Sequence, residues 1–494
     1  MLATLKSGAP VPFSTQLGRV LIIAASALGF KTGAADLPKK TLDALRAAAI
    51  PQASVSAWVQ EVGAAQPTVA LRGEAPMNPA STMKLVTTYA ALELLGPTYR
   101  WKTEVYVDGP QLVLRGYGDP KLNYESFWML LRNLRGRGLR ELTGDIVLDR
   151  SFFGQVQHNP FDSDVFRPYN VAPDALLVNF KSLRFSFVPE AETGVRVFAE
   201  PALPGLEIVN QLRLGAGPCP DGTRAFRDAI QATFQSQPPR ASFIGTYPLS
   251  CGERDLNVAL HEPQEYLAAM IRQLWREMGG TRSGSVREGA ASATARLIYV
   301  HESEPLAEIV RDINKFSNNV MALQLYLTLG GELGGPPART DEAARVIQQW
   351  LAGKKIAAPE LVLENGSGLS RIERISAQHM ATLLAAAWRS PVMPEFVSSL
   401  PIVAADGTMK KRLRGERVAG SAHIKTGLLS DARAIAGYVL DRGGRRHVVV
   451  MMVNHPHAPQ ADAAMDALLE WVYDKPTAPT RAITNRPAAS PRRP

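Results

Sequence analysis

"HIKTGLLSDARAIAGYVL", residues 423–440, joins a polar tripeptide, Lys425-Thr426-Gly427, to an apolar run that alternates with small and polar residues. Alternation with a period of two predicts a β-strand. The following segment, RGGRRHVVVMMVN at 442–454, contains a glycine turn and then a second apolar strand pattern. A helical pattern at 460–474 comes next. This part of the chain therefore predicts an antiparallel meander packed against a helix.

Similar strand and helix patterns occur near the N-terminus and after residue 305. ASVSAWVQEVG (53–63) and PTVALRGE (67–74) predict a hairpin, and PASTMKLVTTYAALELLG (79–96) predicts an amphipathic helix with Ser81 as its N-cap. Residues 99–298 differ, because short β-type runs alternate with many Pro and Gly residues there. Further helices are predicted at 125–137, 263–279, 305–330, 340–352 and 376–388.

This distribution predicts an α/β (α+β) fold with one split domain. Its two parts, 36–98 and 299–474, have the same mixed character and flank the β-rich block at 99–298. A chain of this length is too long for a single hydrophobic core. We therefore predict that 99–298 is an insertion, made of two subdomains.

The first 35 residues have the pattern of a secretory signal peptide. Two basic residues and no acidic one accompany the apolar run VLIIAASALGF (20–30), and small residues follow it. Such a run is too short to span a bilayer. A buried N-terminal helix is the alternative. We expect export to the periplasm and cleavage before Asp36, with no transmembrane segment in the mature chain. A second KTG, at 31–33, would then belong to the leader.

The formal net charge of +9 is concentrated at the two ends of the sequence. Residues 1–35 carry three of these charges and 475–494 carry five, which leaves one for 36–474. That balance argues against the basic surface of a nucleic-acid-binding protein, so no nucleic-acid partner is expected. The end of the chain, 475–494, is rich in Pro and poor in apolar residues, which predicts a disordered basic tail.

Only two cysteines occur, Cys219 and Cys251. This is few for an exported chain, so disulfides are not expected to be its main scaffold. A bridge between them would stabilise the fold by about 3–4 kcal/mol in the chain-entropy description. The sequence leaves open whether they form that bridge or remain free thiols.

Three short motifs carry side chains suited to nucleophilic catalysis. Ser81 and Lys84 are three residues apart at a predicted helix start, so they share one face. A hydroxyl needs such a neighbour as its base, and a lysine serves only if burial or a second cation lowers its pKa. Lys425 is a candidate for that cation, and Ser317-Asn318-Asn319 interrupts a helical pattern. A helix cap, a helix break and a strand-end turn are the ordinary alternatives, but the combination favours a catalytic site.

In this order the motifs resemble the Ser-x-x-Lys, Ser-x-Asn and Lys-Thr-Gly signature of penicillin-recognising serine enzymes. Ser81 and Ser317 are far apart, which is similar to the D-alanyl-D-alanine carboxypeptidase/endopeptidase family of the penicillin-binding protein 4 type. The resemblance implies a transpeptidase/β-lactamase-like domain, an antiparallel sheet flanked by helices, with domains inserted after the first motif. Other matching strings are NPASTMKLVTTYAAL, GYGDPKL (116–122), LTGDIVLDRSFF (142–153), FRPYNVAPDALLVNF (166–180), ENGSGLSR (364–371) and IKTGLLSDARAIAGYV.

The resemblance implies a role for each residue of the first two motifs. Ser81 would attack the carbonyl of a D-Ala-containing peptidoglycan peptide and form an acyl-enzyme, and Lys84 would take its proton. Ser317 would relay a proton to the leaving amine. Asn319 would hold the substrate amide and Lys84. Water would then release the acyl group.

The substrate-binding residues follow from the same resemblance. Lys425 and Thr426 would bind the carboxylate of the terminal D-residue, and Gly427 would let the substrate backbone pass close to the strand. The N–H groups of the nucleophile and of Leu428 would form the oxyanion hole. Asp164, in FDSDVFRP, would reach the cleft from the inserted block, with a solvated loop carboxylate as the alternative. β-lactam antibiotics would acylate the nucleophile because they imitate D-Ala-D-Ala.

Other functions fit the sequence less well. A β-lactamase is the nearest enzymatic alternative, and the long insertion argues against it. A wall-binding protein without turnover would not need an activated nucleophile. His455 and His457 are candidates for metal ligands, although a polar loop is the more ordinary interpretation, so neither a metal nor another cofactor is predicted. The sequence leaves open the balance between carboxypeptidase and endopeptidase activity, the role of the insertion and the oligomeric state.

Overall fold

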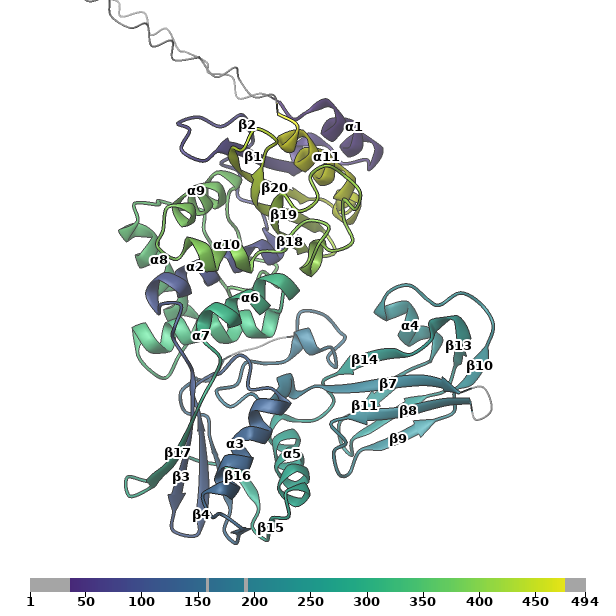
Figure 1. Ribbon diagram of the computed structural model, residues 1–494, viewed down its shortest axis with the longest axis vertical. Coiled ribbons are helices and arrows are strands. Elements are labelled where there is room, and N and C mark those ends of the chain that lie inside the picture. Colours follow the sequence, from purple (N-terminus) through teal and green to yellow (C-terminus); the bar gives the residue numbers. More distant parts are fainter. Residues whose placement is uncertain (1–35, 157–159, 191–193, 476–494) are drawn as a thin grey trace, which may run out of the picture. The chain divides into compact units, whose positions relative to one another are not determined.

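The computed structural model describes residues 36–156, 160–190 and 194–475. The predicted signal peptide, with its KTG at 31–33, and residues 476–494 of the predicted tail lie outside these ranges. Across the described ranges, no helix is both long and apolar enough to cross a membrane. Figure 1 traces the chain from the purple N-terminal elements to the yellow C-terminal ones.

One antiparallel sheet combines strands from both ends of the described chain. Its strands have the order β18-β19-β20-β1-β2, so β18 is an edge strand. β1 (Val55–Glu61) pairs with β2 (Val69–Leu71) on one side and with β20 (Arg446–Asn454) on the other. β19 (Ala432–Leu440) joins β20 to β18 (Ala422–Leu428). The purple strands thus lie beside the yellow-green ones in Figure 1, and the predicted hairpin and meander are confirmed.

The two faces of this sheet are covered by different sets of helices. Ala434, Ala436 and Tyr438 belong to the core that contains α2, α6, α7, α8 and α9, whereas Ile435 and Val439 belong to the core that contains α1 and α11. Neighbouring residues of a strand point to opposite faces, which explains this division. The helices are α1 (Lys39–Ala47), α2 (Lys84–Leu94), α6 (Leu306–Phe316), α7 (Asn319–Gly334), α8 (Thr340–Gly353), α9 (Ala377–Trp388), α10 (Met393–Ser399) and α11 (Asp462–Tyr473).

The inserted block contains a second sheet with the order β16-β6-β4-β3-β17. Apolar residues of this sheet and of helices α3 and α5 share one core. β17 crosses the boundary predicted at 298/299, because it pairs with β3 as far as Glu302. The elements are β3 (Lys102–Asp108), β4 (Gln111–Gly116), α3 (Tyr124–Gly136), β5 (Glu141–Leu142), β6 (Ile146–Asp149), α5 (Pro263–Glu277), β15 (Thr281–Arg282), β16 (Val286–Glu288) and β17 (Arg296–Glu302).

The middle of the insertion, 183–258, folds into small sheets around aromatic side chains. Phe185, Phe187 and Phe243 are buried, and the ring of Phe187 contacts that of Phe243 edge to face at 5.0 Å. The strand orders are β14-β7-β8, β11-β12-β9 and β10-β13. The elements are β7 (Leu183–Glu190), β8 (Gly194–Glu200), β9 (Glu207–Asn210), β10 (Arg213–Gly215), α4 (Thr223–Ala229), β11 (Thr233–Gln235), β12 (Arg240–Phe243), β13 (Thr246–Pro248) and β14 (Arg254–Val258).

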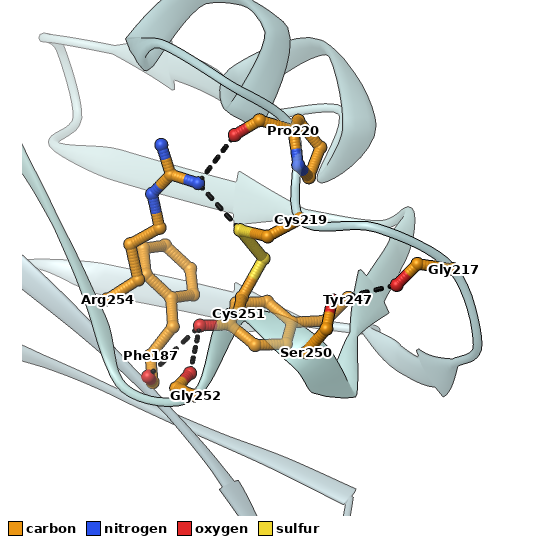
Figure 2. Close-up of a disulfide and its surroundings, with 9 residues drawn as sticks. All are labelled: Phe187, Gly217, Cys219, Pro220, Tyr247, Ser250, Cys251, Gly252 and Arg254. Carbon is orange, nitrogen blue, oxygen red and sulfur yellow. Dashed lines mark hydrogen bonds between the residues drawn. A yellow bond between two sulfur atoms is a disulfide. The ribbon is translucent and has the colours of Figure 1, made fainter.

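The two cysteines form a disulfide in this region. Cys219 and Cys251 are joined, which decides between the two alternatives that the sequence left open (Figure 2). The guanidinium of Arg254 lies beside the bridge and donates hydrogen bonds to the Cys219 sulfur and to the Pro220 carbonyl. The same guanidinium lies 4.3 Å from the centre of the Phe226 ring. The bridge therefore closes the segment 220–250, which contains α4, β11, β12 and β13.

Candidate active site

Ser81 lies in a short 3₁₀ turn, Ala80–Met83, directly before α2. It does not cap the helix, so that prediction is wrong: Met83 occupies the cap position of α2. Pro79 precedes the 3₁₀ turn, and Thr82 donates to the Pro79 carbonyl through both its N–H and its hydroxyl. Because the turn is closed by Thr82, the Ser81 hydroxyl is left to interact with the Lys84 amine, 3.1 Å away.

The turn that carries Ser81 is strained and firmly held. Ala80 is fully buried with a φ of 45°, a left-handed conformation that costs a non-glycine residue about 1–3 kcal/mol. Asn78 accepts a hydrogen bond from the Ala80 N–H, and Asn454 at the end of β20 binds both the N–H and the carbonyl of Asn78. Strain maintained by such contacts is a common property of catalytic turns.

The Lys84 amine is completely buried and has three hydrogen-bond partners. Besides the Ser81 hydroxyl, it donates to the side-chain oxygen of Asn319 and to the backbone carbonyl of Ser367, each at 2.5 Å. Burial lowers the pKa of Lys84 to about 7, and the negative charge of Glu373 opposes that decrease. A lysine with a pKa near 7 can accept a proton at neutral pH.

The second motif connects α6 to α7. Ser317 ends α6 in a left-handed conformation with a φ of 57°, and the Asn318 side chain caps α7 by accepting from the Met321 N–H. Asn319, the first residue of α7, points its side-chain oxygen at Lys84. The predicted interruption of the 305–330 helical pattern is therefore confirmed, and it brings the Asn319 side chain to Lys84 and the Ser317 hydroxyl to Lys425.

The third motif lies on the edge strand β18. Lys425 is fully buried and donates to the Ser317 hydroxyl at 2.8 Å and to the Thr426 carbonyl at 2.7 Å. Burial and, to a smaller degree, the charge of Lys84 lower the pKa of Lys425. The Thr426 hydroxyl donates to that of Thr408, 2.8 Å away on an exposed loop. The third motif thus joins the Lys425 amine to the Ser317 hydroxyl, and the Thr426 hydroxyl to that of Thr408.

Gly427 packs against the turn that carries Ser81. A side chain on Gly427 would lie 2.7 Å from the Pro79 carbonyl oxygen and 3.0 Å from the Ser81 nitrogen. The space that a side chain at 427 would need is therefore filled by the Ser81 turn. Its neighbour Leu428 is 55% exposed. The missing side chain at 427 lets β18 approach the backbone of Ser81 closely.

Asp164 is not brought together with these residues. Its carboxylate forms ion pairs with Arg167, at 2.7 Å, and with Arg227, both within the inserted block. Among the described residues, none of the catalytic candidates is a hydrogen-bond partner of this carboxylate. The carboxylate is therefore ion-paired with two guanidinium groups rather than free in solvent.

Several residues that contact the site were not singled out from the sequence. Ser367 and Glu373 belong to the loop around ENGSGLSR, a string that was noted without a role for its residues. No sequence pattern pointed to Asn454 or Thr408, because their hydrogen-bond partners are distant in the sequence. As for metal sites, the described ranges contain no cluster of three or more His, Cys, Asp or Glu side chains that could hold an ion.

The arrangement as a whole is suited to acyl transfer. It joins a hydroxyl to a buried amine with a pKa near neutrality, and places a second serine–lysine pair beside it. An activated nucleophile, its base and a further hydroxyl are the elements of covalent catalysis through a serine.

Comparison with known proteins identifies the family. The profile of the D-Ala-D-Ala carboxypeptidase 3 (S13) family matches residues 39–474. The D-alanyl-D-alanine carboxypeptidase of Actinomadura sp. strain R39 is 29% identical over 421 residues, which cover 80% of this chain and 77% of that protein. The D-alanyl-D-alanine carboxypeptidase DacB of Haemophilus influenzae is 23% identical over 395 residues, covering 77% and 81%.

Solved structures show the same fold. Penicillin-binding protein 4 of Haemophilus influenzae superposes with a TM-score of 0.72 at 20% identity, covering 88% of this chain and 99% of that one. Its complex with a β-lactam gives a TM-score of 0.68, covering 88% and 98%. The expected penicillin-recognising fold with a β-rich insertion is therefore confirmed. On the match over 39–474, this chain belongs to the D-Ala-D-Ala carboxypeptidase 3 (S13) family of serine peptidases.

Proposed function

We propose that Ser81 is the nucleophile through which this serine D-Ala-D-Ala carboxypeptidase cleaves peptidoglycan stem peptides. The observation that carries the proposal is the contact between the Ser81 hydroxyl and the buried Lys84 amine. A hydroxyl at neutral pH needs a positioned base. A buried lysine with a pKa near 7 meets that requirement.

The partners of Lys84 also explain which way its lone pair points. A neutral amine has two N–H donors and one lone pair. The Asn319 side-chain oxygen and the Ser367 carbonyl oxygen can only accept, so they take the two N–H groups. The Ser81 hydroxyl is the one partner able to donate, and its proton therefore faces the lone pair. This geometry supports Lys84 as the base for Ser81.

The third motif is suited to recognising a terminal carboxylate. The hydroxyls of Thr426 and Thr408 are 2.8 Å apart, and either can turn its proton toward an anion. Lys425, which donates to the Thr426 carbonyl, adds its amine to this group. We assign this group of three residues to the carboxylate of the terminal D-residue. The N–H groups of Ser81 and Leu428, across from each other at Gly427, would bind the developing oxyanion.

Ser317 is assigned to the leaving group. Its hydroxyl accepts from Lys425 Nζ, so its own proton is free to move toward the departing amine. Water would then hydrolyse the ester on Ser81. The same chemistry applies to a terminal D-Ala and to a D-Ala cross-link, so we propose both carboxypeptidase and endopeptidase activity, in the periplasm. Asp164 is left out of this assignment because its two arginine partners occupy it.

The β-lactam complex of the Haemophilus protein supports a further expectation: β-lactams should acylate Ser81. The intact mass of the purified protein after treatment with benzylpenicillin tests this, with Ser81→Ala as control. An increase by one drug molecule in the wild-type protein alone is the expected result. A folded wild-type protein without an adduct would overturn the acyl-enzyme assignment and favour a wall-binding protein without turnover.

A further inference from the structure

The loop that supplies the Ser367 carbonyl to Lys84 is wrapped around one buried carboxylate, that of Glu373. The N–H groups of Glu364, Asn365 and Gly366 donate to one oxygen of Glu373, at 3.1, 3.0 and 2.8 Å. The N–H of Gly368 donates to the other oxygen at 2.9 Å. Successive N–H groups that converge in this way form an anion-binding concavity.

Glu373 is itself held from the opposite side. Its side chain is fully buried, and its backbone N–H donates to the Ser370 hydroxyl at 3.0 Å. The Ser370 carbonyl accepts from the Asn78 side chain, which also holds the turn containing Ser81. The backbone of Glu373 is thus connected through hydrogen bonds to the turn that carries Ser81, while its carboxylate binds the N–H groups of Gly366 and Gly368, on either side of Ser367.

The same loop packs directly on the catalytic turn. Gly368 has a φ of 77°, and a side chain there would lie 1.8 Å from the Ala80 carbonyl oxygen and 2.8 Å from the Ser81 nitrogen. The Gly366 carbonyl accepts from the Thr87 hydroxyl on α2 at 2.6 Å. A small movement of the loop would therefore displace the Ser81 turn and change the hydrogen bond of the Lys84 amine at the same time.

We propose, on the basis of the function assigned above, that Glu373 is a positioning residue for the acylation step. Its carboxylate fixes residues 364–368 so that the Ser367 carbonyl occupies one N–H of Lys84 and directs the lone pair toward Ser81. Its negative charge, buried near the amine, stabilises the ammonium that forms when Lys84 takes the serine proton.

The electrostatic surroundings agree with this assignment. Burial raises the pKa of Glu373, while the N–H groups of the loop oppose that rise because they bind the charged form. Glu373 in turn opposes the decrease that burial imposes on the pKa of Lys84. Two further titratable groups interact with Lys84 or Glu373. Lys425 on β18 is repelled by the charge of Lys84, which lowers the pKa of Lys425. The pKa of Tyr326 on α7 is raised by burial and by the charge of Glu373.

The test is the pH dependence of acylation by benzylpenicillin in Glu373→Gln, followed by intact mass from roughly pH 5 to 9. Glutamine has the same shape, but it removes the charge and places an NH₂ group against one of the loop N–H groups. A misplaced loop carbonyl should lower the second-order acylation constant about 10- to 100-fold. Loss of the charge should lower the pKa of Lys84, moving the acidic limb of the profile down by about 0.5–1 unit.

Two variants serve as comparisons. Glu373→Asp keeps the charge but shortens the side chain, so the rate should fall while the acidic limb stays at its wild-type position. Glu364→Gln removes an exposed carboxylate from the same loop and should leave both rate and limb unchanged. Circular dichroism and thermal unfolding show which variants are folded.

A folded Glu373→Gln protein with an unmoved acidic limb would overturn the proposal, whatever its rate, because a merely structural role changes the rate without changing the pKa of Lys84. If Glu373→Gln does not fold, the matched pair Glu373→Asp and Glu373→Asn decides, because the two differ only in charge: a lower acidic limb in Glu373→Asn than in Glu373→Asp supports the proposal, and equal limbs contradict it. Absence of an adduct on the wild-type protein is a different result, since it refutes the proposed function itself.

Discussion

The Lys84 amine donates a 2.5 Å hydrogen bond to the side-chain oxygen of Asn319, although the two residues are 235 positions apart in the chain. Each is the first residue of a buried helix, Lys84 of α2 and Asn319 of α7. The environment of the proposed base is therefore set by how two helix starts meet. Changes at either start should alter the protonation of Lys84 in a direction that can be stated in advance.

Asn319→Asp should move the acidic limb of β-lactam acylation upward. A carboxylate 2.5 Å from the amine favours the ammonium form, so the pKa of Lys84 rises above its value of about 7. Less of the neutral base is then present at pH 7, and acylation there should slow by about tenfold or more. Asn123→Asp, which keeps the cap of α3, is the matched control and should retain the wild-type profile. A downward shift would contradict the assignment of Lys84.

Lys84→Arg should nearly abolish acylation at every pH. A guanidinium stays protonated, so it cannot accept the proton of Ser81. Loss of a general base typically costs about 10²–10⁴ in rate. Lys39→Arg, at an exposed position on α1, should acylate like the wild-type protein. Rapid acylation of Lys84→Arg would show that another group serves as the base.

Gly427→Ala should slow acylation because the new methyl group would meet the Ser81 turn. It would lie 2.7 Å from the Pro79 carbonyl and push the Ser81 turn away from β18. A displacement of this kind costs about 10²-fold when it moves a reacting group by 1 Å. Gly353→Ala is the control, because a side chain at the end of α8 meets no atom within 4 Å. Equal acylation rates in the two variants would argue against contact between β18 and the turn.

Thr408→Val should weaken the reaction with peptides that end in a free carboxylate. The variant keeps the shape of the side chain but removes the hydroxyl 2.8 Å from that of Thr426. A hydrogen bond to a charged group contributes about 1.5–3 kcal/mol, which corresponds to about 10- to 100-fold in kcat/KM. A peptide with an amidated C-terminus should show a much smaller difference. Thr382→Val, on the exposed side of α9, is the control and should discriminate between the free and the amidated peptide as the wild-type protein does. Equal losses on both peptides would remove Thr408 from carboxylate binding.

The disulfide should stabilise the inserted block without affecting chemistry at Ser81. Cys219 and Cys251 are separated by 32 positions, and closing a loop of that size is worth about 3–4 kcal/mol. The double variant Cys219→Ser/Cys251→Ser should therefore unfold at a lower temperature, as should the wild-type protein in reductant. Benzylpenicillin should still acylate the double variant at 25 °C. An unchanged unfolding temperature would mean that the bridge does not limit the stability of the protein.

The sequence by itself was sufficient for the hairpin, the meander and the three motifs. Alternating apolar residues at 432–440 and 446–454 predict strands correctly, because period two is imposed by the backbone of any half-buried strand. The break at Ser317 was predictable because a serine and two asparagines interrupt an otherwise continuous helical pattern. The residues of the motifs were found because each motif is local, within three or four positions.

Only the tertiary structure decided how those residues work together. The Ser81 turn, the oxygen partners of Lys84, the hydroxyl of Thr408 and the carboxylate of Glu373 depend on contacts between segments far apart in the chain. The contact of Gly427 with the Ser81 turn and the ion pairs of Asp164 are of the same kind. Local patterns carry no information about such pairs, because a hydrogen bond or a buried charge is specified by distance in space. The motifs supply the side chains that we propose to react. The packing of α2, α7, β18 and the 364–373 loop sets the protonation state of these side chains and the direction in which they point.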